Sequence, residues 1–228
     1  MIIRTRAVTI ITTLFMFVMA VSASDKTVPV KVACVGDSIT FGFGIKDRAT
    51  KSYPSQLGEM LGKDYDVKNF GVSGTTILTK SSKNKSYVRT KQFKAAKAFN
   101  PDIVIIKLGT NDAKIRNWQH KEEFVSNYVE LINAFQALDS KPTIWVCNPT
   151  PAFRKKYGID PVALREEVTP KVDDVANITT VKVIDLYEPL KDKAKLVPDF
   201  IHPNSDGAKI IAETVFDAIR RSREHNIK

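Results

Sequence analysis

From residue 30 onward the chain alternates between two hydrophobic patterns. Short runs rich in β-branched residues predict strands at 30–35, 66–69, 103–108, 143–147 and 181–185. Between them, apolar residues recur every three or four positions, as in amphipathic helices. These segments predict helices at 53–61, 124–138, 161–176 and 206–221.

Strands that alternate with helices predict an α/β fold with a parallel sheet. The runs 103–108 and 143–147 are almost continuously apolar, which indicates strands covered on both faces. We therefore expect one three-layer α/β/α sandwich over residues 24–228, with five strands and about five helices. In such a sheet, ligands bind beyond the carboxyl ends of the strands.

Residues 1–23 have a different pattern, that of a secretory signal peptide. Arg4 and Arg6 precede an apolar run at 7–21, and Ser22 and Ala23 form a small-residue exit. The run is shorter than the roughly 20 residues of a membrane-spanning helix. We predict cleavage after Ala23 and an exported protein, periplasmic or secreted, without stable membrane insertion. An uncleaved anchor is the alternative.

The 228 residues are 43% hydrophobic and 26% charged, a balance typical of a globular protein. The formal net charge is +10, and lysines are concentrated at 80–97. That stretch is either a solvated face or a surface for an anionic partner. We interpret it as a solvated face and expect no nucleic-acid partner.

Ser38 is the first candidate for chemistry, because it directly follows the first predicted strand, in Gly36-Asp37-Ser38. A serine needs a base before it becomes a nucleophile. Of the three histidines, only His202 lies in a loop before a predicted helix with an aspartate, Asp199, three residues ahead. Asp199 can orient the imidazole toward Ser38. The alternatives are a helix-capping serine and a loop-stabilising Asp–His pair.

Acyl transfer also requires donors for the oxyanion. The second strand ends in NFGVSG, where Gly74 can bring its N–H close to a ligand, and the third ends in GTND, where Asn111 offers a side-chain amide. A single glycine loop is more often a plain turn. Several loops at strand ends, each with a required group, favour an active site.

GDSI, NFGVSG, GTND and DFIHP, in this order, resemble the four blocks of the GDSL/SGNH hydrolase family. Ile39 replaces the leucine of the first block. The resemblance implies a flavodoxin-like five-stranded sheet in the order 2-1-3-4-5. It also implies Ser38 as nucleophile and oxyanion donor, Gly74 and Asn111 as further donors, and Asp199 with His202 as the rest of the triad.

Other residues near these blocks have roles outside the triad and the oxyanion hole. Asp37 and Asp112 are interpreted as structural, since a carboxylate beside an oxyanion would oppose it, although Asp37 is also a candidate for substrate binding. Trp118 is either a sugar-stacking platform at the pocket rim or a residue packed beneath the loop. Cys34 and Cys147 are expected to be free, because strand 3 of the implied order separates them.

No group of residues has metal-ligand spacing, and no phosphate-binding loop is present, so we expect neither metal nor cofactor. The resemblance implies a serine esterase, similar to exported carbohydrate esterases that remove O-acetyl groups from glycans. The alternatives are a lysophospholipase or acyl thioesterase of the same family, or an inactive carbohydrate-binding module.

Overall fold

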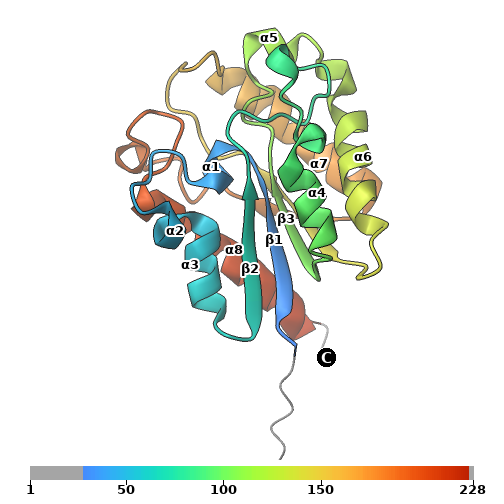
Figure 1. The fold of residues 1–228 in the computed structure, drawn as a ribbon. Helices are drawn as coiled ribbons and strands as arrows, with labels where there is room; N and C mark the ends of the chain where they lie inside the picture. The colour runs from blue at the N-terminus through green and yellow to red at the C-terminus, as the bar shows by residue number, and fades with distance from the viewer. Residues whose placement is uncertain (1–27, 226–228) are drawn as a thin grey trace, which may run out of the picture.

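The computed structural model describes residues 28–225 and contains one five-stranded parallel sheet (Figure 1). The strand order is β2-β1-β3-β4-β5, as the resemblance implied. The strands are β1 (Val30–Gly36), β2 (Tyr65–Gly71), β3 (Ile103–Lys107), β4 (Thr143–Asn148) and β5 (Lys182–Asp185). The predicted signal segment, 1–23, lies outside the described residues.

Helices cover both faces of the sheet, which confirms the predicted three-layer α/β fold (Figure 1). One face packs against α3 and α8, and the other against α4, α6 and α7. Between residues 28 and 225, no helix has the length and apolar character needed to cross a bilayer. The helices are α1 (Ser38–Phe41), α2 (Arg48–Lys51), α3 (Tyr53–Leu61), α4 (Lys91–Ala98), α5 (Ile115–Trp118), α6 (Phe124–Gln136), α7 (Thr169–Thr179) and α8 (Ser205–His225).

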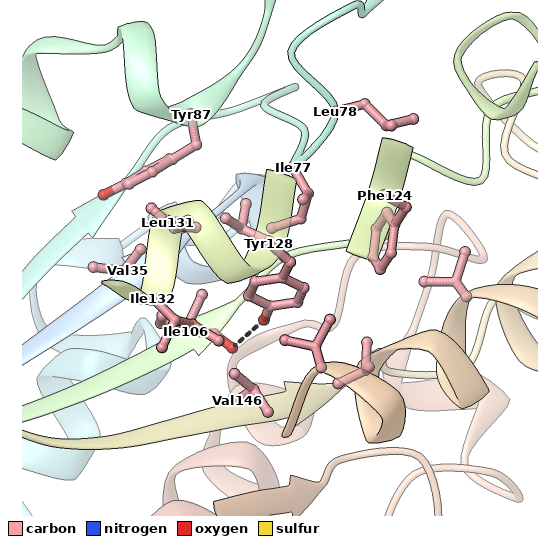
Figure 2. Close-up of a cluster of buried hydrophobic side chains, with 14 of the residues drawn as sticks. Val35, Ile77, Leu78, Tyr87, Ile106, Phe124, Tyr128, Leu131, Ile132 and Val146 are labelled. Carbon is pink, nitrogen blue, oxygen red and sulfur yellow. Dashed lines mark hydrogen bonds between the residues drawn. The ribbon is translucent and has the colours of Figure 1, made fainter. Parts of the chain in front are cut away.

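The central strands send alternate side chains into two separate cores, because successive residues of a strand point to opposite faces. In β1, Val32 and Cys34 join the core beneath α3 and α8, whereas Ala33 and Val35 join the core on the other face. Figure 2 shows the second core, where the Tyr128 hydroxyl donates a hydrogen bond to the Ile106 carbonyl at 3.4 Å. Burial on both faces explains the continuous apolar runs.

Two helical segments differ from the predictions. The segment predicted as a helix at 161–176 begins with a π-helical turn, Ala163–Val168, before α7. The lysine-rich stretch at 80–97, interpreted only as a solvated face, contains most of α4. In α4 only Ala96 is fully buried, so the apolar repeat was too sparse to indicate a helix.

The two cysteines are free and buried, as expected. Cys34 lies in β1 and Cys147 in β4, with β3 between them. Two strand spacings of about 4.8 Å exceed the Cα separation that a disulfide tolerates. Burial raises the pKa of the Cys34 thiol to about 12, which leaves it protonated and unreactive.

Candidate active site

Ser38 lies at the carboxyl edge of the sheet, where β1 ends and α1 begins. Asp37 caps this helix, because its Oδ1 accepts the Ile39 N–H at 2.9 Å. Gly36 has no space for a side chain, since a Cβ there would lie 2.5 Å from the carbonyl oxygen of Lys107. This close packing fixes the position of Ser38, which is buried but still lines a pocket.

His202 comes from the other end of the chain and meets Ser38 directly. The Ser38 Oγ lies 2.9 Å from His202 Nε2, and His202 Nδ1 lies 2.6 Å from Asp199 Oδ2. The second carboxylate oxygen of Asp199 accepts the backbone N–H groups of Ile201 and His202 at 3.0 and 2.7 Å. The loop before α8 therefore folds around the carboxylate and holds the imidazole toward the serine.

The charges in this arrangement favour one tautomer of His202. Partial burial of Asp199 opposes its ionisation, but the hydrogen bonds from His202 and Ile201 outweigh that effect and hold the pKa of the carboxyl below its usual value. An ionised carboxylate only accepts hydrogen bonds, so it favours a proton on Nδ1 of His202. Nε2 is then free to accept the Ser38 hydroxyl proton.

Gly74 and Asn111 face the same pocket as Ser38. Gly74 has a φ of 85°, and a Cβ there would meet no atom within 4 Å, so the space beside its Cα is open. The Asn111 Nδ2 donates to the Thr75 carbonyl at 3.1 Å, which orients the amide. An amide nitrogen carries two hydrogens, and one remains for a ligand. The three expected oxyanion donors thus lie around one cavity.

This cavity has a volume of about 210 Å³ and opens to solvent beside His202. Two exposed aromatic rings flank the imidazole, with ring centroids 4.6 Å from it for Phe43 and 5.8 Å for Tyr157. The residues around the cavity are Ser38, Phe43, Ser73, Gly74, Asn111, Lys114, Tyr157, Ile159 and His202. The pocket is small, and the two aromatic rings form the part of its wall next to the histidine.

Asp37 is not a substrate-binding residue in this structure, which corrects that tentative assignment. Its side chain is fully buried and pairs with the equally buried ammonium of Lys107 at 3.2 Å. The same ammonium donates to Thr110 Oγ1 at 2.7 Å. Lys107 therefore connects the loop that carries Ser38 to the loop that carries Asn111.

Asp112 is also buried, and it joins two further segments. Its carboxylate oxygens accept the backbone N–H groups of Ile77 and Leu78 at 3.2 and 2.8 Å. Burial raises the pKa of Asp112 to about 7, and the negative charge of Asp37 adds to the increase, although the backbone hydrogen bonds oppose it. The side chain serves to hold the loop after β2 against the loop after β3.

Trp118 lies away from the pocket, which corrects its tentative assignment as a sugar platform. The side chain is only 7% exposed, and its ring packs edge-on against Phe124 at 5.5 Å. The indole N–H donates to Glu167 at 2.9 Å. Trp118 thus packs beneath the loop, which was the alternative. Across residues 28–225, no cluster of three or more histidine, cysteine or acidic side chains has the geometry of a metal site.

Sequence reasoning missed the aromatic walls of the pocket. Phe43 follows the first block within FGFG, and Tyr157 lies in the loop after β4, which carries no motif. Lys107 was also missed, although a lysine inside the apolar run IVIIKL was a usable signal. A buried ammonium requires an anionic partner, and Asp37 lies at the end of the neighbouring strand β1.

Comparison with known proteins gives the family of the chain. The model of the GDSL-like lipase/acylhydrolase family matches residues 34–210. The chain belongs to this family of ester hydrolases, as the motifs predicted. It is 41% identical over 209 residues to an acetylxylan esterase of Xylanibacter ruminicola. The match covers 84% of this chain and 43% of that relative, so the chain spans less than half of the relative's length.

Solved structures of the same fold include a carbohydrate acetylesterase from Sinorhizobium meliloti, with a TM-score of 0.71 and 18% identity over 84% of this chain and 99% of that one. An arylesterase described as putative, from Agrobacterium tumefaciens, gives a TM-score of 0.67 and 20% identity over the same shares of the two chains. At this low identity the likeness establishes the fold, the three-layer α/β arrangement of the family.

Proposed function

We propose that this protein is a serine esterase that removes acetyl groups from carbohydrates through Ser38, His202 and Asp199. One observation carries the proposal: Ser38 Oγ, both imidazole nitrogens of His202 and the Asp199 carboxylate form one hydrogen-bonded chain at the base of an open pocket. This is the arrangement that activates a serine hydroxyl.

In the first half of the reaction, Ser38 Oγ attacks the ester carbonyl carbon while His202 Nε2 takes the hydroxyl proton. The carbonyl oxygen becomes an oxyanion and accepts hydrogen bonds from the N–H groups of Ser38 and Gly74 and from the Asn111 amide. When the oxyanion collapses, the bond to the alcohol oxygen breaks and His202 protonates that oxygen. The sugar hydroxyl leaves and an acetyl-Ser38 ester remains.

In the second half, a water molecule takes the place of the alcohol. His202 removes a proton from the water as its oxygen attacks the acetyl carbon, and the same donors hold the oxyanion. Collapse breaks the bond to Ser38 Oγ, returns the proton from His202 to that oxygen and releases acetic acid, which ionises to acetate in solution. Asp199 stays ionised throughout and stabilises the imidazolium form of His202 in both halves.

Different features support a short acyl group and a carbohydrate alcohol. A cavity of about 210 Å³ suits a short acyl chain better than a long one. Phe43 and Tyr157, 45% and 52% exposed, offer aromatic faces to the alcohol part at the pocket mouth. The acetylxylan esterase relative supports a carbohydrate alcohol.

Hydrolysis of p-nitrophenyl esters with chains of two to twelve carbons tests the proposal. We expect the acetyl ester to be the best substrate, and Ser38→Ala to lower kcat by at least about 10³-fold, with residual catalysis from the oxyanion donors. A preference for eight carbons or more would favour a lysophospholipase or thioesterase. No hydrolysis of any ester would favour a binding module.

A matched control separates loss of the nucleophile from loss of the fold. Ser52 is also buried and also lies at the start of a helix, but outside the pocket, where its Oγ bonds to Ser55. Ser52→Ala should keep wild-type kcat. Acetate release from acetylated xylan, pectin and sialoglycans would then identify the carbohydrate.

We also propose export, which rests on the N-terminal sequence pattern. Mass spectrometry of the protein recovered outside the cytoplasm of its producing cells should give Ser24 as the first residue, whereas an intact N-terminus retained in membranes would indicate the uncleaved anchor.

A further inference from the structure

Besides the three hydrogen bonds described above, the Asp199 carboxylate accepts one from a side chain outside the triad. The Tyr157 hydroxyl donates to Asp199 Oδ2 at 3.3 Å, the same oxygen that contacts His202 Nδ1. With the two backbone N–H groups on Oδ1, the carboxylate accepts four hydrogen bonds. This fills the acceptor capacity of an ionised carboxylate.

The backbone at Tyr157 is unusual for an aromatic residue. Its φ is 53°, in the left-handed region that L residues avoid. Phe200, beside the triad in the loop before α8, is the other aromatic residue with positive φ among residues 28–225, at 72°. The two loops are joined where the Phe153 N–H donates to the Phe200 carbonyl at 3.0 Å. Strained residues often mark functional positions.

Backbone hydrogen bonds hold the Tyr157 loop in place, although the side chain is half exposed. On the far side of the pocket, the Asp160 N–H donates to the Ala113 carbonyl at 3.1 Å, and the Ile115 N–H donates to the Gly158 carbonyl at 3.3 Å. The loop thus connects the segment after β3 to the loop before α8. Its anchoring places the Tyr157 hydroxyl beside Asp199 before any substrate binds.

From this geometry we propose that Tyr157 is a positioning residue that shares the charge of Asp199 with His202 and so sets the pH at which His202 becomes an effective base. The proposal rests on the proposed esterase function. A donor on Oδ2 withdraws part of the negative charge that stabilises imidazolium. The negative charge of Asp199 raises the pKa of Tyr157, so the hydroxyl stays protonated and remains a donor in any assay near neutrality.

Other charged groups near the pair lie in the segment after β3 and in the loop after β4, and the test leaves them unchanged. Lys114 lies across the pocket, Arg154 stacks on the Phe200 ring at 4.6 Å, and Lys156 lies 5.7 Å from the centre of the Tyr157 ring. Constant ionic strength keeps the screening of these cations equal across pH.

Tyr157→Phe removes the hydroxyl and keeps the ring. We expect the rise of kcat/KM with pH to move to higher pH by about 0.5 unit, because the substitution removes one of several hydrogen bonds to the charged carboxylate. The variant should then be about three-fold slower than wild type on the acidic side and nearly equal above the transition, with KM little changed. A variant-to-wild-type ratio that is constant with pH would overturn the proposal.

A second variant and a spectroscopic readout keep the test independent of folding and of substrate. Tyr157→Gly suits the positive φ better and should show the same shift in pH dependence without loss of Tm. The downfield proton signal of His202 Nδ1–H, assigned by its loss in Asp199→Asn, should move in Tyr157→Phe. An unmoved signal would exclude the shared charge.

Tyr187→Phe provides the control. This tyrosine lies outside the pocket, next to Arg165, so its loss of a hydroxyl should leave both the pH profile and the proton signal as in wild type. If wild-type protein hydrolyses no ester, the proposed function fails. If it does, and Tyr157→Phe behaves like Tyr187→Phe, only the role of Tyr157 fails.

Discussion

Two carboxylates lie near Ser38, and each pairs with a side chain that can carry positive charge. Asp37 pairs with Lys107 at 3.2 Å, and both side chains are fully buried. Asp199 pairs with His202 at 2.6 Å, and these side chains are 27% and 11% exposed. The first pair lies beneath the loop that carries Ser38, whereas the second faces the pocket.

The difference shows that burial and partner, not the carboxylate itself, decide the role. A pair closed off from solvent and substrate cannot exchange protons with either, and its desolvation offsets much of its attraction. Asp37 and Lys107 therefore contribute geometry, since the ammonium joins two loops. Asp199 and His202 are open enough for proton transfer and keep a defined geometry. Substitutions in the two pairs should therefore have different effects.

The largest effect is expected from Asp199→Asn. The amide can still accept the backbone N–H groups, but it would present N–H to His202 Nδ1 and favour the wrong tautomer. We expect kcat to fall by about 10³–10⁴-fold near neutral pH, with partial recovery as pH rises, and the Tm to change little. Initial rates on a short acetyl ester from pH 5 to 9 measure this.

The matched control for that variant is Asp37→Asn, the same substitution in the buried pair. It should lower the Tm more than Asp199→Asn does and lower kcat far less. If Asp199→Asn has wild-type rates at every pH, Asp199 is not the residue that orients His202, and the two pairs do not differ in role as described.

Lys107→Met should have the next largest effect, this time on stability. Removal of the ammonium leaves the Asp37 carboxylate buried without a counter-ion, which costs about 3–5 kcal/mol of unfolding free energy. Chemical denaturation measures this loss. The double variant Asp37→Asn with Lys107→Met removes both charges and should recover a large part of it. An equal loss in the single and double variants would show that packing of the lysine stem, not its charge, matters.

Lys107 also shows where prediction from sequence stopped. The strands and their order followed from apolar runs and the four motifs, because burial on both faces of a parallel sheet leaves a plain hydrophobic pattern. The four candidate site residues could be named because each lies in a loop beside a strand end or a helix start: Ser38 follows β1, Gly74 and Asn111 lie in the loops after β2 and β3, and His202 precedes α8. Lys107 was hidden inside such a run, and only the register of β3 places it beneath Asp37.

The residues that sequence reasoning left open or missed depend on loop conformation. Trp118 follows a motif, but whether an aromatic ring stacks inward or outward is decided by tertiary contacts such as Phe124 and Glu167. Tyr157 reaches Asp199 through a loop with positive φ after β4, and no local pattern encodes that path. The walls of the pocket therefore needed the structure.

Asn111→Ala tests the side of the site opposite to His202. Its amide should matter only when negative charge develops on the carbonyl oxygen, so kcat should fall by about 10²–10³-fold, or about 3–4 kcal/mol, with little change in KM. The defect should be the same at each pH, unlike that of Asp199→Asn. A variant whose main change is a higher KM would place Asn111 in substrate binding instead.

The smallest effect concerns Asp112, which is buried like Asp37 but forms no ion pair with any residue between 28 and 225. Burial, with a contribution from Asp37, raises the pKa of its carboxyl from 3.8 to about 7, so the folded state binds a proton more tightly than the unfolded chain does. The stabilising contribution is complete below the unfolded value and is lost as pH rises toward 7. Between pH 5 and 6 this carboxyl alone should lower the free energy of unfolding by about 1 kcal/mol.

Asp112→Asn will be less stable at every pH, because an amide accepts only one of the two backbone N–H groups, but its stability should vary less over this interval. Parallel slopes for variant and wild type in urea denaturation at pH 5 and 6 would mean that Asp112 is already ionised, and that burial without a counter-ion is tolerated here through the two backbone hydrogen bonds alone.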